Sequence, residues 1–237
     1  MPSSCPEPGP GSAPRPRALR AAAALAGLAL GFYSAPAPGA DAPGPAAAEA
    51  SPRARPGPTA VVEGLHAALI DLMKAGPELD FEQRAARIDP VIRASYDIPY
   101  MARKAVGRYW RDLSEEERRR LVDLFTRLSV ANYAARFTDY SEQRFDTVGE
   151  EPSSRGTVLV KTVLVNGDER VELNYRLRPG TDGWKIIDVF LQGTVSELAM
   201  RRAEYTSVIK REGFPALLEA IEERIARYAR GEVPKAG

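Results

Sequence analysis

The sequence has few of the residues that build common active sites, with one histidine and one cysteine among 237 residues. Cys5 precedes the first long apolar run, so we expect it to leave with a cleaved leader and the mature chain to contain no thiol. Without cysteine there is neither a disulfide framework nor a thiolate metal site. His66 alone forms neither a zinc site of ordinary composition nor a pair with a cysteine nucleophile. We therefore expect no metal, no cofactor and no enzymatic activity.

An excess of one charge sign is also missing, since 33 Lys and Arg residues face 32 Asp and Glu residues. This near-neutral balance gives no electrostatic argument for a nucleic-acid partner. No serine lies in a G-x-S-x-G context, and no glycine motif that cradles phosphate is present. The sequence therefore lacks the motifs of serine hydrolases and of nucleotide-binding enzymes.

The N-terminus has the residue order of a signal peptide. Arg15, Arg17 and Arg20 precede the uncharged run AAAALAGLALG at 21–31. This run is too short to cross a bilayer core, which takes about 20 helical residues. Small residues around 37–42 offer a cleavage site, so we expect residues 1–40 to direct export to the periplasm.

Composition divides the rest of the chain into a linker, one domain and a tail. Residues 41–58 are mostly Ala, Pro and Gly, which is typical of a disordered linker. Residues 59–231 carry regular apolar patterns and are expected to form one domain, and 232–237 a tail.

The helical period predicts helices on both sides of a central β region. The expected helices cover residues 59–75, 81–92, 98–106, 115–137, 196–211 and 214–230. Asp80 with Gln83, and Ser114 with Glu117, have the spacing of capping boxes at two of the helix starts. Pro90 is expected to kink or divide the second helix.

Between these helices the apolar period changes from 3.6 to 2. Residues 170–178 alternate apolar and polar side chains, and Asn166-Gly167 predicts a tight hairpin that joins them to 157–165. Residues 184–191 form a further predicted strand, and 144–148 a weaker first one. The order predicts a single α+β domain in which flanking helices cover an antiparallel sheet of about four strands.

Two of the predicted strands are apolar on both faces. In 184–191 strict alternation places Trp184, Ile186 and Phe190 on one face, and Ile187, Val189 and Leu191 on the other. Such a sheet needs either helices on both faces or an internal ligand, and both alternatives stay open. For a diacyl lipid, a carrier must enclose most of about 30 methylenes, because each contributes about 0.8 kcal/mol to membrane binding.

Three segments resemble the MlaC-type family, also called toluene-tolerance auxiliary components. They are GRYWRDLSEEERRRLVDLFTRLSVANYAARF (107–137), NYRLRPGTDGWKIIDV (174–189) and GTVSELAMRRAEYTSVIKREGFPALLEAI (193–221), within a similarity that covers 59–230. The resemblance implies a curved NTF2-like or cystatin-like sheet with an internal apolar cavity. It also implies a monomeric periplasmic carrier that passes phospholipid between an inner-membrane transporter and an outer-membrane complex.

The sequences GTVSEL and RRAEY within the last segment are similar to those of the hopanoid-associated HpnM branch of this family. That similarity implies a hopanoid or related polycyclic lipid as ligand. It also implies an inner-membrane exporter of the resistance-nodulation-division type as partner.

Two sets of site residues follow by hypothesis. The predicted lipid lining is Tyr109, Trp110, Leu121, Phe125, Leu128, Tyr133, Leu159, Val163, Tyr175, Ile187 and Val189, with ordinary core packing as the alternative for each. The predicted contacts to a headgroup or partner are Arg118, Arg119, Arg120, Arg201 and Arg202, with solvated helix faces as the alternative.

Two other functions stay open beside the lipid carrier. Asp188 among apolar residues, with a nearby tyrosine, would suit an isomerase-type proton transfer, although strict alternation places it opposite the predicted lining. The domain could also bind protein through an apolar groove and carry no lipid.

Overall fold

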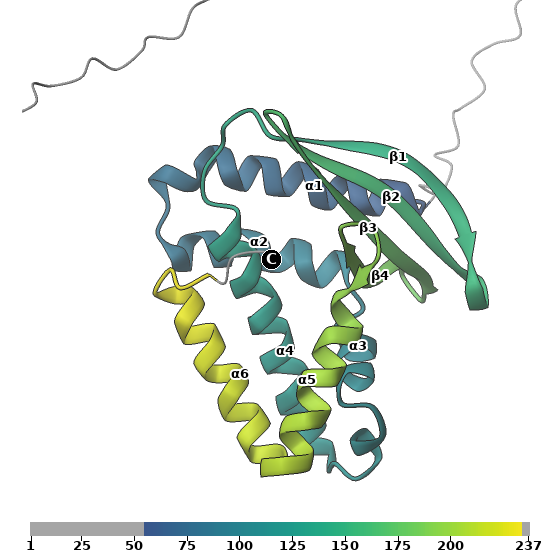
Figure 1. The fold of residues 1–237 in the computed structure, drawn as a ribbon, viewed down its shortest axis with the longest axis vertical. Helices are drawn as coiled ribbons and strands as arrows, with labels where there is room; N and C mark the ends of the chain where they lie inside the picture. Colours follow the sequence, from purple (N-terminus) through teal and green to yellow (C-terminus); the bar gives the residue numbers. More distant parts are fainter. Residues whose placement is uncertain (1–54, 234–237) are drawn as a thin grey trace, which may run out of the picture. The chain divides into compact units, whose positions relative to one another are not determined.

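A computed structural model of the chain describes residues 55–233, which form helices packed against an antiparallel sheet (Figure 1). The helices are α1 (Pro58–Ala75), α2 (Phe81–Ser95), α3 (Ile98–Val106), α4 (Glu115–Arg136), α5 (Glu197–Glu212) and α6 (Phe214–Ala229), with short 3-10 turns η1 (Gly76–Glu78), η2 (Gly107–Arg111) and η3 (Ser154–Gly156). The strands are β1 (Arg144–Ser153), β2 (Thr157–Asn166), β3 (Glu169–Gly180), β4 (Gly183–Leu191) and β5 (Val195–Ser196). The α+β prediction is confirmed, with five strands where about four were expected. The predicted signal peptide, the linker up to residue 54 and residues 234–237 of the tail lie outside the described residues.

Both predicted capping boxes are present. The Asp80 carboxylate accepts from the Gln83 backbone N–H at 2.8 Å, and the Gln83 side chain accepts from the Asp80 N–H at 2.9 Å. Ser114 and Glu117 make the same reciprocal pair at the start of α4. Pro90 does not divide α2, which runs from Phe81 to Ser95 without interruption. Because α2 packs against α1 and α4, tertiary contacts offset the hydrogen bond that proline removes.

The five strands follow one another in the order β1-β2-β3-β4-β5, and every neighbouring pair is antiparallel. Asn166 and Gly167 lie in the β2–β3 hairpin as predicted, and Gly167 has the positive φ of 59° that such a tight turn requires. Register shifts interrupt the β1–β2 pairing at Val148 and the β3–β4 pairing at Ile187. Bulges increase local twist, which contributes to the curvature of the long strands in Figure 1.

The bulge at Ile187 corrects the predicted faces of β4. Tyr175 pairs with Val189, and Leu177 pairs with Ile186. Tyr175 and Leu177 are two residues apart in β3, so they share a face, and Ile186 and Val189 share it with them. The prediction that Ile186 and Val189 point to opposite faces is therefore wrong, because the extra residue resets the alternation.

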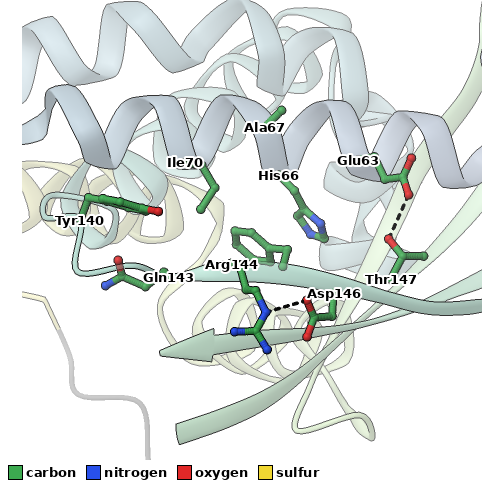
Figure 2. A pocket seen from close by; sticks show the side chains of 10 residues that line it. Glu63, His66, Ala67, Ile70, Tyr140, Gln143, Arg144, Asp146 and Thr147 are labelled. Carbon is green, nitrogen blue, oxygen red and sulfur yellow. Dashed lines mark hydrogen bonds and ion pairs between the residues drawn. The ribbon is translucent and has the colours of Figure 1, made fainter. Parts of the chain in front are cut away.

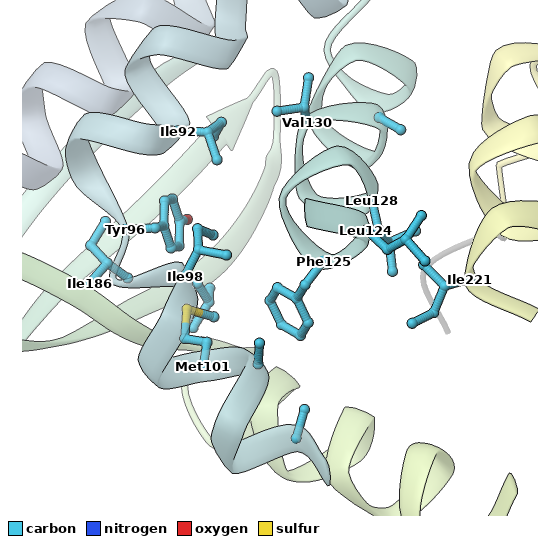
Figure 3. Packing of buried hydrophobic residues seen from close by; sticks show 14 of the residues in the cluster. Ile92, Tyr96, Ile98, Met101, Leu124, Phe125, Leu128, Val130, Ile186 and Ile221 are labelled. Carbon is cyan, nitrogen blue, oxygen red and sulfur yellow. The ribbon is translucent and has the colours of Figure 1, made fainter. Parts of the chain in front are cut away.

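The apolar interior has a sheet side and a helical side. On the sheet side α1 lies along the sheet (Figure 1). Leu65 and Leu69 of α1 are fully buried. On the helical side α4 packs mainly against α2, α3 and α6, and Figure 3 shows Phe125 pointing toward α3 and Leu128 toward α6. Both sides belong to one continuous hydrophobic cluster. None of the helices within 55–233 has the length and apolar character needed to cross a membrane.

Candidate functional site

An open groove of about 650 Å³ follows the seam between α1 and β1 (Figure 2). It is lined by Glu63, His66, Ala67, Ile70, Tyr140, Gln143, Arg144, Phe145, Asp146 and Thr147. Its rim is polar, because Glu63, Arg144 and Asp146 are charged, whereas His66 points from α1 toward β1 in Figure 2 and is buried. The groove therefore brings solvent to the edge of the space between α1 and the sheet.

Three aromatic rings separate this groove from the apolar interior, and we call them the aromatic wall: His66, Phe145 and Tyr175. The imidazole of His66 stacks on the ring of Phe145, with centroids 3.9 Å apart and planes 11° apart. The Nε2 atom of His66 shares a hydrogen bond of 3.0 Å with the phenol oxygen of Tyr175. The wall thus joins α1, β1 and β3.

The aromatic wall is neutral at neutral pH. Burial lowers the pKa of His66 to about 4, so its imidazole carries no charge at pH 7. Burial also raises the pKa of the Tyr175 phenol well above its usual value, and the nearby groups Tyr133 and Glu197 add to this. Two neutral groups that satisfy each other are compatible with an apolar interior, where an unpaired ion would be costly.

A second pair of phenols belongs to or packs against the main apolar cluster. The hydroxyls of Tyr96, the residue that follows α2, and Tyr133 in α4 are hydrogen-bonded to each other. Burial raises the pKa of both phenols, and the carboxylate of Glu197 raises them further. The apolar cluster therefore contains several hydroxyl groups, and each of those named is hydrogen-bonded to another group of the chain.

Exposed polar bonds hold α1 to β1. The hydroxyl of Thr59 donates to the Glu150 carboxylate at 2.6 Å, and the hydroxyl of Thr147 donates to the Glu63 carboxylate at 3.1 Å. β1 is also an edge strand that pairs only with β2. Because a hydrogen bond contributes only about 1 kcal/mol net, these two exposed bonds add little to the strength of the α1–β1 seam.

The structure divides the predicted lipid lining between several places. Seven members belong to or pack against the main apolar cluster: Trp110, Leu121, Phe125, Leu128, Tyr133, Tyr175 and Val189. Of these, Tyr175 and Val189 face the space beneath α1, whereas Phe125 and Leu128 point toward other helices (Figure 3). Leu121 lies one turn before Phe125 on the same face of α4.

The remaining four predicted lining residues lie elsewhere. Leu159 pairs with Arg176 and Val163 with Glu172, so both lie on the face of the sheet opposite Tyr175. Ile187 is buried at the bulge, and Tyr109 lies in the η2 turn. The predicted set is therefore not one surface, and its contact with lipid stays a prediction.

The five predicted arginines do not form a cluster. Arg118 donates to the backbone carbonyls of Trp110 and Arg111, and Arg120 pairs with Glu222 at 3.2 Å. The guanidinium of Arg201 lies 5.6 Å from the ring centre of Phe125. Arg119 and Arg202 are exposed, on α4 and α5.

Asp188 and Tyr175 are not brought together. Asp188 pairs with Arg176, the neighbour of Tyr175 in β3, and so lies on the opposite face of the sheet. Its carboxylate accepts hydrogen bonds from the Ser196 hydroxyl at 2.7 Å and the Leu198 N–H at 3.1 Å. Asp188 thus provides an acceptor for a backbone N–H in the first turn of α5. Burial raises the pKa of Asp188, although Asp188 and Tyr175 do not form the carboxylate–tyrosine pair that isomerase chemistry would use. Within 55–233 no group of three or more His, Cys, Asp and Glu residues has the arrangement of a metal site.

Sequence patterns missed two of the three wall residues. Residue patterns assign His66 no place in a site, but it is only 5% exposed and hydrogen-bonded to Tyr175 of β3. Phe145 lies in the strand that gave the weakest alternation signal. The available signal was that His66 falls one residue after Leu65 and three before Leu69, on the apolar face of α1.

The chain is similar to known proteins in both sequence and fold. A sequence model described as MlaC protein matches residues 63–223. The intermembrane phospholipid transport system binding protein MlaC of Haemophilus influenzae is 24% identical over 132 residues, which cover 54% of this chain and 61% of that protein. A phospholipid-binding protein from Ralstonia solanacearum, solved in complex with a phospholipid, aligns with a TM-score of 0.66 and 23% identity over 73% of this chain and 99% of that one. The last likeness establishes the curved fold that the sequence predicted.

Proposed function

The chain belongs to the MlaC family. We propose that it is a periplasmic transport protein that binds a phospholipid, and that the acyl chains of this lipid lie between α1 and the inner face of the sheet. The observation that carries this proposal is the aromatic wall, because it closes an apolar interior behind a seam held by exposed polar bonds. The match to the H. influenzae protein and the fold shared with the R. solanacearum protein support phospholipid as the ligand class.

The groove itself is too polar to hold acyl chains. Charged residues line its rim. About 30 methylenes held there would lose the transfer free energy of about 0.8 kcal/mol that each gains in a membrane. Val160 of β2 and Leu65 and Leu69 of α1 are fully buried apolar side chains of the same hydrophobic cluster as Tyr175. The chains therefore belong behind the wall, and the headgroup belongs in the polar groove.

The α1–β1 seam is the proposed route of lipid access. Separating it breaks the Thr59–Glu150 and Glu63–Thr147 bonds and parts His66 from Phe145. The carboxylates and hydroxyls released by this motion become accessible to water or to a headgroup. The pairing of β2 with β3 and of β3 with β4 stays intact in this motion.

The compartment and the partners are further parts of the proposal. The order of basic and apolar residues in 1–40 supports export, and the word intermembrane in the name of the H. influenzae relative supports transfer between membranes. We propose transient contacts with an inner-membrane transporter and an outer-membrane lipid complex, by a monomeric carrier.

Solvent extraction of the exported, purified protein followed by mass spectrometry tests the function. We expect a near-stoichiometric phospholipid. A hopanoid at that stoichiometry would support the proposal that the protein carries lipid, but would show that the lipid is not a phospholipid. If the purified protein contains no lipid and takes up none from vesicles, the proposal is contradicted. The protein would then be better explained as a module that binds other proteins.

A further inference from the structure

A second groove, of about 460 Å³, lies between η2 and α5, and we call it the basic groove. Three cations line it, Arg108, Arg202 and Lys210, together with the hydroxyl-bearing Tyr109, Thr206 and Ser207. α3 and α5 extend side by side away from the sheet in Figure 1, so the basic groove lies far from the α1–β1 seam. Its residues therefore serve no part of the lipid site proposed above.

The three cations of the basic groove lack acidic partners. No carboxylate lines the groove, and within 55–233 none lies within 4 Å of Arg108, Arg202 or Lys210. Glu204 and Glu212 of α5 instead pair with Arg224 and Arg211. The groove lining thus carries a net positive charge with no carboxylate of its own.

Two hydroxyl groups add hydrogen-bond donors to this charge. The phenol oxygen of Tyr109 accepts from Arg108 Nη2 at 3.2 Å, and the hydroxyl oxygen of Ser207 accepts from Arg211 Nη1 at 2.7 Å. Each oxygen is used as an acceptor, so each hydroxyl proton is left to donate. Thr206 differs, because its hydroxyl already donates to the Arg202 carbonyl at 2.6 Å.

A glycine allows Arg202 to approach the η2 turn. Gly107 has a φ of +59°, and a Cβ atom there would lie 3.2 Å from Nε of Arg202. Only a residue without a side chain both adopts this backbone conformation readily and leaves that space. The Arg202 guanidinium is therefore placed beside the turn that carries Arg108 and Tyr109.

We propose that the basic groove binds a phosphate group. Guanidinium groups form paired, charge-assisted hydrogen bonds with phosphate oxygens, and a lysine adds a point charge. The groove offers two guanidinium groups, one ammonium group and two hydroxyl donors around a single hollow. The phosphate is borne by an anionic lipid headgroup at a membrane surface or is free in solution. The site goes beyond lipid carriage and does not depend on it.

The test compares the full chain with the triple variant Arg108→Gln, Arg202→Gln, Lys210→Gln. The control is Arg87→Gln, Arg127→Gln, Arg230→Gln, which removes the same charge from exposed cations elsewhere. Binding is measured to vesicles of phosphatidylglycerol and phosphatidylcholine in equal parts, to phosphatidylcholine vesicles, and to inorganic phosphate. We expect the groove variant, but not the control, to lose about tenfold or more in affinity for a phosphate-bearing probe.

Loss of binding to the phosphatidylglycerol vesicles alone identifies a membrane headgroup, and loss of binding to inorganic phosphate identifies a free ligand. Equal effects of both triple variants on every probe, or binding of the groove only to an acidic polyglutamate peptide, would overturn the proposal. Lipid extracted from the same preparations keeps the two claims apart, since the groove variant is expected to retain its bound phospholipid.

Discussion

His66 and Tyr175 are 109 residues apart in the sequence, yet Nε2 of one lies 3.0 Å from the phenol oxygen of the other, between the α1–β1 groove and the buried face of the sheet. Tyr175 is 2% exposed and His66 5%. Because both groups are buried, each depends on the other for a hydrogen-bond partner. The contact ties the helix that covers the sheet to the middle strand of that sheet.

Replacing Tyr175 with Phe removes this partner and leaves a buried imidazole nitrogen unsatisfied. We expect the free energy of unfolding to fall by about 1–3 kcal/mol, measured by urea denaturation. Phospholipid exchange with vesicles should accelerate, because one contact of the wall is lost. Tyr140→Phe is the matched control, since Tyr140 lines the same groove but is 41% exposed and should change neither quantity. Equal effects of the two variants would contradict the role of the wall.

Stability should fall as the solution is acidified through the His66 window. The pKa of His66 is about 4 in the folded chain against 6.5 as its ordinary value. Between these pH values the unfolded chain therefore binds more protons than the folded chain. The free energy of unfolding consequently decreases as the pH falls from 6.5 to 4. The loss from this group is about 3 kcal/mol and is complete below the folded pKa.

Urea denaturation at a series of pH values measures that loss. His66→Gln keeps a hydrogen-bonding side chain but does not titrate, so its free energy of unfolding should depend less on pH in this window. If the wild-type chain and the variant show the same slope, His66 is not the buried, neutral group described above.

The capping boxes at Asp80 and Ser114 and the hairpin at Asn166-Gly167 could be predicted because each depends on a few adjacent residues. The bulge at Ile187 could not, because nothing in the apolar pattern marks the extra residue. Alternation alone then placed Ile186 and Val189 on opposite faces.

Which helix covers the sheet also could not be predicted from helix amphipathicity. α1 and α4 both have an apolar face, and α4 is the longer helix, but α1 lies along the sheet while Phe125 and Leu128 of α4 face other helices. The predicted lining consequently mixed residues from two sides of the core. Contacts such as His66 with Phe145 join distant segments, and a single sequence carries no signal for such pairing.

Tryptophan substitutions separate the sheet side from the helical side of the core. Val160 pairs with Tyr175 on the inner face of the sheet, and Val163 lies on the outer face. We expect Val160→Trp to lower the amount of bound lipid while the protein stays folded, because the indole occupies space that the acyl chains use. Val163→Trp should retain its lipid.

Leu128→Trp completes this series. Leu128 is 1% exposed among helices, so the larger side chain should overpack that region and cost about 1–3 kcal/mol of stability without a separate binding defect. Lipid content by mass spectrometry and unfolding by circular dichroism give the two readouts. If Leu128→Trp loses its lipid but keeps the stability of the wild-type protein, the acyl chains must lie on the helical side of the core.

Linking α1 to β1 covalently should stop lipid exchange. Glu63 and Thr147 contact each other across the seam, so cysteines at these positions in a Cys5→Ser background can be joined with a short bis-maleimide. We expect the linked protein to keep the lipid it holds and to exchange it at least about tenfold more slowly than before linking. A link between cysteines at Glu151 and Lys161, whose exposed side chains pair at 2.7 Å between β1 and β2, is the control. Unchanged exchange in the seam-linked protein would exclude this route.

Mapping the acyl chains directly tests the central claim. A phospholipid with a photoreactive group near the end of one chain is loaded into the full-length protein, irradiated, and the labelled residues are identified by mass spectrometry. The account predicts labels on the facing surfaces of α1 and the sheet, at residues such as Leu65, Leu69, Val160 and Tyr175. Labels confined to the outer face of the sheet, at Leu159 and Val163, or to the α4–α6 contact, would contradict it.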